Sequence, residues 1–397
     1  MPLARCSRGI ISTRNQGGGD KKQGLPPSMG LGPFSMNIIQ RLAGYCKCNI
    51  DKPELNKGVF VAITYFNDVM RSTDEGNTWE LVDSVPSTYN NVQQLEQNWG
   101  SIAYGDGVFV VVSQHNKVMR SLDKGITWIN ATYIPPAFQF SDPNNETPEK
   151  NQWWGVAYGE GIFMMVSFEM EIMYSVDKGD TWISNYHDVT EGLKAIAFGK
   201  EVWVAVKYDY TALYSTNKGV NWAYASTPTV GGQWIDVTYG GGVFVAVAEQ
   251  DSDGYLIMIS ENGTVWTGKD IDSTLGITQL QGVIYGDGVF VAVSYDGKFL
   301  RSENKGSTWD DASDNVTTQI GENENETPGW SSIAYANGVF VAVSVWGKVI
   351  INKNKGTSGS WVFAEGEIPF KDWTDVAFGT GGSSVLAPLP QLPPPPL

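Results

Sequence analysis

The sequence of 397 residues predicts an all-β protein, a seven-bladed β-propeller built from four-stranded antiparallel blades. Three observations carry this prediction. A box of the form Ser-x-Asp-x-Gly-x-Thr-Trp recurs seven times with variations, the box tryptophans lie 40 to 54 residues apart, and helical periodicity is absent between them. A period of this length is typical of stacked supersecondary units, and four short strands per unit fit radial stacking as blades.

Each unit begins with a strand, a tight turn and a second strand, as in residues 99–113. The turn Gly105-Asp106-Gly107 supplies residues that tolerate positive φ between two β-rich runs, which is typical of a hairpin. The second strand is apolar almost without alternation, so we expect neighbouring layers to cover both of its faces. A third strand such as 117–121 follows, then the box, and then a fourth strand that we expect to begin at the box tryptophan.

The box itself has a mechanical explanation. An Asp or Asn side chain in a tight turn accepts hydrogen bonds from nearby backbone N–H groups, Gly takes a conformation closed to other residues, and Trp buries a large ring beneath the turn. We therefore assign the boxes a structural role. Their Asp or Asn residues are Asp74, Asp123, Asp177, Asn217, Asn262, Asn304 and Asn354.

The two ends of the repeat region complete one blade. The first unit starts at Gly58 without a first strand, whereas residues 373–379 form a first strand with no second strand after it. Pairing of the strand at about 373–379 with the strands within 58–80 therefore closes the ring at seven blades. This organisation predicts a basic, flexible leader over 1–50, a propeller over 51–382, and a Pro-rich disordered tail over 383–397.

Charge is distributed unevenly along the chain. Residues 1–50 carry seven Lys or Arg against one Asp, which leaves 20 basic and 42 acidic residues in the remainder. The basic, acid-poor leader resembles an organelle transit segment, for a plastid or a mitochondrion, and an irregular extension rich in Gly and Pro is the second interpretation. The acidic ring argues against a nucleic-acid partner, and the lack of an 18-residue apolar run argues against a membrane span.

The boxes resemble the Asp-box, or BNR, repeats of the sialidase-like propeller superfamily, and the resemblance covers residues 58–379. That superfamily includes sialidases, xyloglucan-cleaving glycoside hydrolases, sortilin-type receptors, sugar-binding lectins and seven-bladed photosystem II assembly factors. The resemblance implies the propeller fold, whereas function has to be argued from the site. In length, blade count and leader the chain is most similar to the photosystem II assembly propellers.

The residues available for catalysis are few. A sialidase-like site would need three clustered arginines, but Arg71, Arg120 and Arg301 are the only arginines in the ring and share one repeat slot. His115 and His187 are the only histidines and lie in different units, so neither a histidine-based metal site nor a Ser-His-Asp triad is expected. The three cysteines all precede the ring. We expect no catalytic residue, no metal and no cofactor.

Function is instead expected on the connectors between blades and on the loops between second and third strands, which share one face in this superfamily. Aromatic and acidic residues in these loops would stack sugars or hold basic side chains. Trp154 is added because it lies outside the repeat pattern. The candidate binding residues are Phe66, His115, Trp154, Glu169, Tyr208, Asp209, Asp251, Tyr295, Asp296 and Trp346.

The sequence thus predicts a non-catalytic binding or assembly module that engages a protein or a glycan through this loop face. A sugar-binding lectin and a glycoside hydrolase are the alternatives. A hydrolase needs a positioned carboxylate pair, and Asp236 and Asp375 occupy the same first-strand slot in two units. A solvated rim with incidental aromatics is the remaining interpretation of the loops.

Overall fold

The computed structural model of the chain describes most of residues 58–380. The described ranges are 58–83, 85–86, 98–136, 152–169, 171–186, 192–229, 232–249, 255–313, 328–366, 368 and 371–380. The predicted leader over 1–50, the predicted tail over 383–397 and the candidate Asp251 lie outside them.

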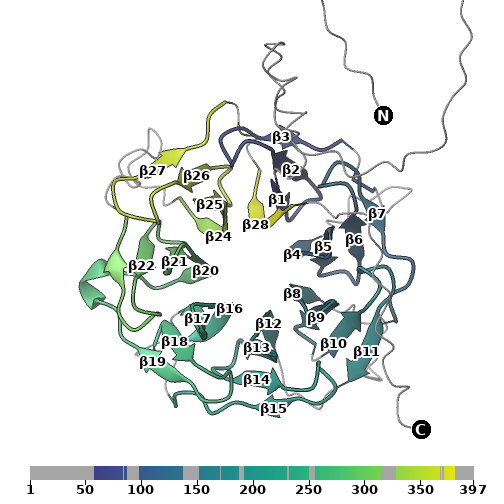
Figure 1. Ribbon diagram of the computed structural model, residues 1–397, viewed down its shortest axis with the longest axis horizontal. Coiled ribbons are helices and arrows are strands. Elements are labelled where there is room, and N and C mark those ends of the chain that lie inside the picture. The colour runs from purple at the N-terminus through teal and green to yellow at the C-terminus, as the bar shows by residue number, and fades with distance from the viewer. Residues whose placement is uncertain are drawn as a thin grey trace, which may run out of the picture. The chain divides into compact units, whose positions relative to one another are not determined.

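Seven four-stranded antiparallel sheets form a ring, which confirms the predicted all-β seven-bladed propeller (Figure 1). The only helix among the described residues is a short 3-10 turn, η1 (Ser273–Leu275). We number the blades from the one that contains β1. Blade 1 has the strand order β28-β1-β2-β3, and blades 2 to 7 follow along the chain with four consecutive strands each.

The strands fall into four concentric classes. The innermost strands are β28 (Trp373–Gly379), β4 (Trp99–Gly105), β8 (Trp153–Gly159), β12 (Leu193–Gly199), β16 (Gln233–Gly240), β20 (Leu280–Gly286) and β24 (Trp330–Ala336). The second strands are β1 (Val59–Thr64), β5 (Val108–Ser113), β9 (Ile162–Ser167), β13 (Val202–Lys207), β17 (Val243–Glu249), β21 (Val289–Ser294) and β25 (Val339–Ser344).

The outer half of each blade is shorter. The third strands are β2 (Val69–Ser72), β6 (Val118–Ser121), β10 (Glu171–Ser175), β14 (Ala212–Ser215), β18 (Ile257–Ser260), β22 (Phe299–Ser302) and β26 (Val349–Asn352). The fourth strands are β3 (Glu80–Leu81), β7 (Ile129–Asn130), β11 (Ile183–Tyr186), β15 (Ala223–Tyr224), β19 (Thr267–Lys269), β23 (Asp310–Asp311) and β27 (Trp361–Phe363).

The second strand of each blade is packed from both sides. In β1, Val61 and Ile63 join a core cluster with β5 of blade 2, whereas Phe60 and Ala62 join a cluster with β25 of blade 7. Every residue of β1 is buried. This explains why the second strands are apolar without alternation, because both of their faces are covered by neighbouring blades.

The ring closes as the sequence predicts. The C-terminal strand β28 pairs antiparallel with β1 from Val59↔Gly379 to Thr64↔Trp373. Blade 1 is therefore built from the two ends of the repeat region. In Figure 1 the yellow strand β28 lies beside the purple strands β1 and β2.

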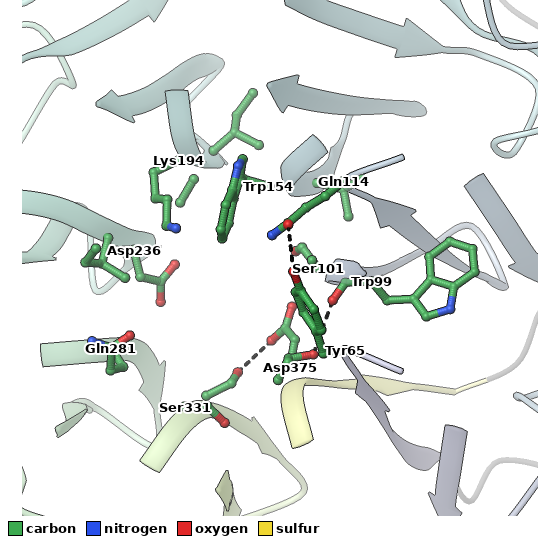
Figure 2. Close-up of a pocket in the computed structure, with 18 of the residues that line it drawn as sticks. Tyr65, Trp99, Ser101, Gln114, Trp154, Lys194, Asp236, Gln281, Ser331 and Asp375 are labelled. Carbon is green, nitrogen blue, oxygen red and sulfur yellow. Dashed lines mark hydrogen bonds between the residues drawn. The ribbon is translucent and has the colours of Figure 1, made fainter. Parts of the chain in front are cut away.

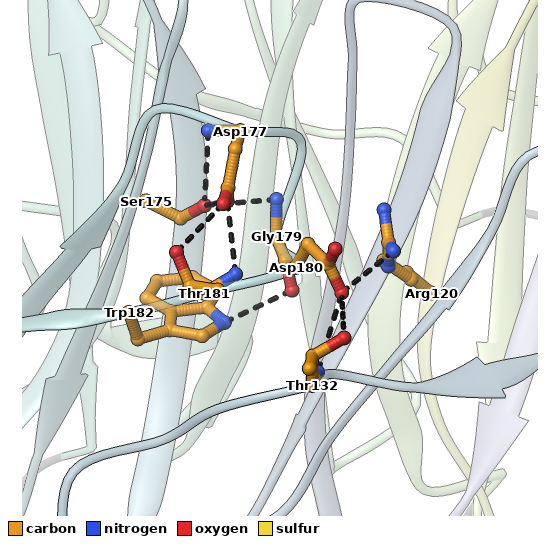
Figure 3. Close-up of polar contacts among 8 residues, drawn as sticks. All are labelled: Arg120, Thr132, Ser175, Asp177, Gly179, Asp180, Thr181 and Trp182. Atoms are coloured by element: carbon orange, nitrogen blue, oxygen red, sulfur yellow. Dashed lines mark hydrogen bonds and ion pairs between the residues drawn. The ribbon is translucent and has the colours of Figure 1, made fainter.

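The box of blade 3 shows how the turn is held (Figure 3). Asp177 accepts hydrogen bonds from the Ser175 hydroxyl at 2.8 Å, the Thr181 N–H at 2.9 Å and the Thr181 hydroxyl at 2.6 Å. The Trp182 indole N–H donates to the Gly179 carbonyl at 3.1 Å. Burial alone raises the pKa of Asp177, but these bonds from Thr181 and Ser175 outweigh it and lower the pKa below its usual value.

The boxes also connect neighbouring blades. The Arg120 guanidinium of blade 2 lies 2.7 Å from the Asp180 carboxylate in the box of blade 3 (Figure 3). The Arg301 guanidinium of blade 6 donates to the Lys355 carbonyl of blade 7 at 2.7 Å. Two of the three arginines in the repeated slot thus reach the next box, whereas Arg71 pairs with Glu80 on the fourth strand of its own blade at 2.7 Å.

One detail of the prediction is wrong. The fourth strands of blades 1 to 6 begin one residue after the box tryptophan, and only β27 begins at its tryptophan, Trp361. In blade 1 the Trp79 indole N–H donates to the Gly76 carbonyl at 2.9 Å. The tryptophan therefore belongs to the turn, and the outer edge pairing starts after it.

Removal of residues 373–397 tests the closure. This deletion takes away the inner strand of blade 1 and exposes the buried β1, so we expect the cooperative unfolding transition to be lost in urea or thermal unfolding. Deletion of 381–397 is the matched control and should leave the transition in place, because it spares β28. An unchanged transition in the longer deletion would contradict this closure.

Candidate binding site

Two faces of the ring can be distinguished by their contacts. The box lysines reach the turns between first and second strands, as in Lys178 to Asp106 at 3.1 Å and Lys355 to Asp287 at 3.5 Å, so boxes and these turns share one face. On the other face, which we call the connector face, the loops between second and third strands meet the connectors. The Gln114 N–H, for example, donates to the Asn98 carbonyl at 2.9 Å.

A bulge occurs at the start of every inner strand, on the connector face. The residue after the first-strand Trp or Leu is skipped in the pairing, as when Trp153↔Ser167 is followed by Gly155↔Val166. A bulge re-aims the side chain of the extra residue. The seven skipped residues are Thr374, Gly100, Trp154, Lys194, Ile235, Gln281 and Ser331.

These seven residues line one cavity of about 310 Å³ at the connector-face end of the central channel (Figure 2). The loop residues Tyr65, Gln114 and Val345 also line it. Six of the seven skipped residues are uncharged. The repeat therefore builds the cavity wall, and the identity of each skipped residue decides the chemistry.

Lys194 is the one charged residue among the seven. Its ammonium lies 3.2 Å from the centroid of the Trp154 ring and 5.9 Å from that of the Tyr208 ring. Such cation–π contacts stabilise a cation that has left bulk water. Burial lowers the pKa of Lys194 to about 8, and the Glu249 carboxylate opposes this lowering.

Asp236 follows the skipped residue Ile235 on the inner strand β16, and it also faces the cavity (Figure 2). Its carboxylate accepts hydrogen bonds from the Val237 N–H at 2.8 Å and from the Val283 N–H of the next blade at 2.9 Å. Burial raises the pKa of Asp236 to about 6, against the hydrogen bond from Val283, and the nearby Asp375 raises it further. The side chain thus joins blades 5 and 6.

Asp375 likewise joins neighbouring blades, here blades 1, 2 and 7, through hydrogen bonds to its carboxylate. It accepts hydrogen bonds from the Ile102 N–H of blade 2 at 2.9 Å, the Ser332 hydroxyl of blade 7 at 2.6 Å and the Val376 N–H at 2.8 Å. Burial raises the pKa of Asp375 despite these bonds. The two carboxylates are therefore anchored to the wall by backbone donors.

The predicted aromatic candidates lie around this cavity. Phe66 and Trp346 are 49% and 46% exposed in the loops of the adjacent blades 1 and 7. Trp154 lines the cavity, Tyr208 lies beside Lys194, and Tyr295 is half-buried in the corresponding loop of blade 6. The structure thus brings Trp154 and Tyr208 together and places the other aromatics along the rim.

The predicted acidic candidates hold the loops in place. Glu169 accepts a hydrogen bond from the Gln152 N–H at 2.6 Å, and Asp296 accepts one from the Thr278 N–H at 2.9 Å, so both tie a loop to a connector. Asp209 forms an ion pair with the Lys207 ammonium at 2.7 Å. These contacts explain the acids structurally, whereas the proposed binding role stays a prediction.

A serine or threonine hydroxyl holds most of these loops. Ser344, for example, accepts hydrogen bonds from the Trp346 N–H at 3.2 Å and the Lys348 N–H at 3.0 Å. His115 is fixed in the same way, through its N–H and the Ser113 hydroxyl at 3.1 Å. In blade 4 this position is Lys207, which is fully buried and uses Asp209 as its partner.

Sequence reasoning missed Lys194, Gln114 and the exposed Phe168 and Tyr210. The signal for Lys194 was present, because the residue after each first-strand Trp or Leu forms a column that is charged only there. Among the described residues, no group of three or more His, Cys, Asp or Glu side chains is placed to hold a metal ion. In the same part of the chain, no helix has the length and apolarity that crossing a membrane requires.

Comparison with known proteins gives structural neighbours. No family model and no curated protein match the chain. Among solved structures, it is similar to YCF48 bound to D1 peptide, with 16% identity, a TM-score of 0.50, and coverage of 67% of this chain and 81% of that chain. YCF48 from Cyanidioschyzon merolae matches with 16% identity, a TM-score of 0.41, and coverage of 53% and 70%. These likenesses concern the fold alone.

Substitution of Asp209 tests the buried ion pair. Asp209→Ala leaves the Lys207 ammonium buried without its carboxylate, so we expect a loss of about 3 kcal/mol in the free energy of unfolding. Adding Lys207→Ser should restore most of this loss, because five of the other six blades have Ser or Thr at that position. Urea unfolding measures both variants. An equal loss in the double variant would show that the pair is not the cause.

The raised pKa of Asp236 predicts a pH dependence. The folded protein binds this proton more tightly than the unfolded chain, whose Asp pKa is 3.8, so stability should fall as pH rises from about 4 through about 6. The fall attributable to Asp236 is on the order of 3 kcal/mol. We expect Asp236→Asn to remove it, as measured by urea unfolding at pH 4.5 and pH 7.5. A constant difference between variant and parent at both pH values would contradict the raised pKa.

Proposed function

We propose that this chain is a non-catalytic binding propeller whose connector face docks onto a partner protein. The observation that carries the proposal is the distribution of exposed aromatic side chains. Four of the six exposed aromatics among the described residues lie in loops between second and third strands. They are Phe66, Phe168, Tyr210 and Trp346.

The other surfaces expose a different kind of side chain. The boxes expose Leu122, Ile126, Val220 and Val265, which are aliphatic, and the outer strands expose mainly aliphatic residues as well. Aromatic side chains dominate the binding energy of protein interfaces, whereas scattered exposed aliphatics are ordinary. The composition of the connector face therefore favours it as the docking surface.

The loops are also well anchored, which favours binding. Their ends are tied to the connectors by backbone hydrogen bonds, such as that from the Val345 N–H to the Gly329 carbonyl at 3.1 Å. A loop that is already ordered loses little conformational entropy on binding. The rim would therefore present Trp346 to a partner at low entropic cost.

Tyr210 gives a further indication. Its φ of 74° lies in the left-handed region, where the equivalent loop residues of other blades are Asn67, Asn116, Gly297 and Gly347. A bulky aromatic residue in this conformation is strained by about 1 kcal/mol or more. Strain of this kind clusters at functional sites, which supports a role for the exposed Tyr210 ring.

The structural neighbours support a protein partner. YCF48, a propeller of similar fold, has been solved with a D1 peptide bound to it. A protein of similar fold thus binds a peptide, which supports a protein ligand for this chain. The identity of the partner and the role of the chain in an assembly process belong to the proposal.

A glycan-directed activity is the second candidate, because the central cavity contains two carboxylates with raised pKa values. Asp236 and Asp375 both face this cavity, and a hydrolase would need one of them as an acid. Their backbone hydrogen bonds favour an anchoring role instead. Release of reducing sugar from β-glucan, xyloglucan or mucin by the parent, lost in Asp236→Asn, would favour the hydrolase, and a glycan-array signal would favour a lectin.

The rim aromatics test the docking proposal. We expect the full chain to capture a protein partner in a pull-down with mass spectrometry, and Phe66→Ala with Trp346→Ala to reduce the capture about tenfold or more, since each is an exposed aromatic contact. Leu122→Ala with Val220→Ala on the box face is the matched control and should capture the same protein fully. Equal capture by the rim variant, or loss in the box variant, would place the docking surface elsewhere.

A further inference from the structure

We propose that the central cavity is a carboxylate-binding site in which the Lys194 ammonium, seated on the Trp154 ring, is the cation. We infer that the ligand is an acidic side chain of the docked protein, and this part of the inference rests on the proposed function. The cavity itself supports it through three features. These are a cation without an anion, amide donors on the facing wall, and carboxylates that are already hydrogen-bonded.

Lys194 has no carboxylate within ion-pair distance among the described residues. Several other lysines of the ring do have one, and the fully buried Lys207 lies 2.7 Å from Asp209. The contacts of the Lys194 ammonium are instead the faces of Trp154 and Tyr208. A partly desolvated ammonium gains more from an incoming anion than a hydrated one does.

The charged groups around Lys194 come from three other strands. Glu249 on β17 acts on Lys194 at a distance, and Asp236 on β16 and Asp375 on β28 face the same cavity. Both aspartates are anchored by backbone N–H donors from neighbouring strands. They are therefore committed to the wall of the cavity, which leaves the ammonium to receive a ligand.

Gln114 supplies a donor from the other side of the cavity. Its amide oxygen accepts a hydrogen bond from the Tyr65 hydroxyl at 3.3 Å, which leaves its NH₂ group available, and the residue is only 7% exposed. Both residues line the same cavity, and in the view of Figure 2 the Trp154 ring lies between the Lys194 ammonium and the Gln114 amide. Each of the two groups can donate a hydrogen bond to a carboxylate oxygen that enters the cavity.

The same charges disfavour a dianion. A dianion such as phosphate would face one ammonium against the carboxylates of Asp236 and Asp375. A single carboxylate requires one positive charge and two hydrogen-bond donors. The cavity of about 310 Å³ has room for a carboxylate on a short side chain.

Titration with acetate tests the site without the partner. The probes are acetate, and the capped tripeptides acetyl-Gly-Glu-Gly-amide and acetyl-Gly-Gln-Gly-amide, added to the full chain at constant ionic strength and followed by NMR. We expect saturable shifts of the Trp154 indole N–H resonance with acetate and with the Glu peptide, and none with the Gln peptide. The pKa of Lys194, followed through its side-chain ¹³C resonance, should rise when acetate is bound.

Variants make this test specific. Lys194→Met should weaken acetate binding about tenfold or more, because the charge-assisted hydrogen bond is lost, while Lys194→Arg should retain it. Lys305→Met on the box face is the matched control and should bind as the parent does, and circular dichroism verifies that each variant is folded. Tighter binding of the Glu peptide than of acetate would assign the ligand to a protein side chain, whereas equal binding would assign it to a free acid.

The two proposals fail separately. Absence of a saturable shift in the parent, or equal acetate affinity in folded Lys194→Met, would overturn the carboxylate site. If partner capture is still lost in the Phe66→Ala, Trp346→Ala variant, the docking proposal stands without it. Conversely, acetate binding with undiminished capture by that rim variant would overturn the docking proposal alone.

Discussion

Burial of the second strand on both faces requires a closed ring of blades. Val61 of β1 packs toward blade 2 and Phe60 packs toward blade 7, so neither blade leaves that strand exposed. In an open row of blades, the second strand of each end blade would have one apolar face exposed to solvent. Only a closed ring covers all of them, and the pairing of β28 with β1 completes it.

Ring closure brings seven inner strands together, and the bulge at the start of each creates the cavity wall. Because the bulge is part of the repeat, every blade contributes one residue there, from Thr374 of blade 1 to Ser331 of blade 7. The scaffold fixes where these side chains lie and leaves their chemistry free. In this column of skipped residues the one charged group is the Lys194 ammonium on the Trp154 ring.

The sequence predicts the architecture well because its signals are local and repeated. Apolar second strands, Gly-containing turns and box tryptophans recur with a steady period, and the unmatched first strand at Trp373 specifies the closure. The repeated arginine position can also be recognised in the sequence. Arg120 and Arg301 occupy it, and both contact the box region of the next blade. Repetition therefore predicts the structural residues.

The candidate site is predicted less completely because its contacts cross between strands and blades. The acids Glu169 and Asp296 look like a binding rim in the sequence, yet each accepts hydrogen bonds from a connector backbone. Asp209 looks the same, and its partner Lys207 is revealed only by the fold. Lys194 is visible in the sequence as the only charged residue of its column, but only the register shows that this column is skipped in the pairing and lines the cavity.

We place function on the connector face, at the loops and the cavity, and a structural role on the boxes. Hydrogen–deuterium exchange of the full chain, with and without the captured partner, distinguishes these two regions. Binding should protect the loops at 64–68, 208–211 and 345–348 and leave the boxes at 121–128 and 215–222 unchanged. Protection of the boxes, with the three loops unaffected, would contradict the account.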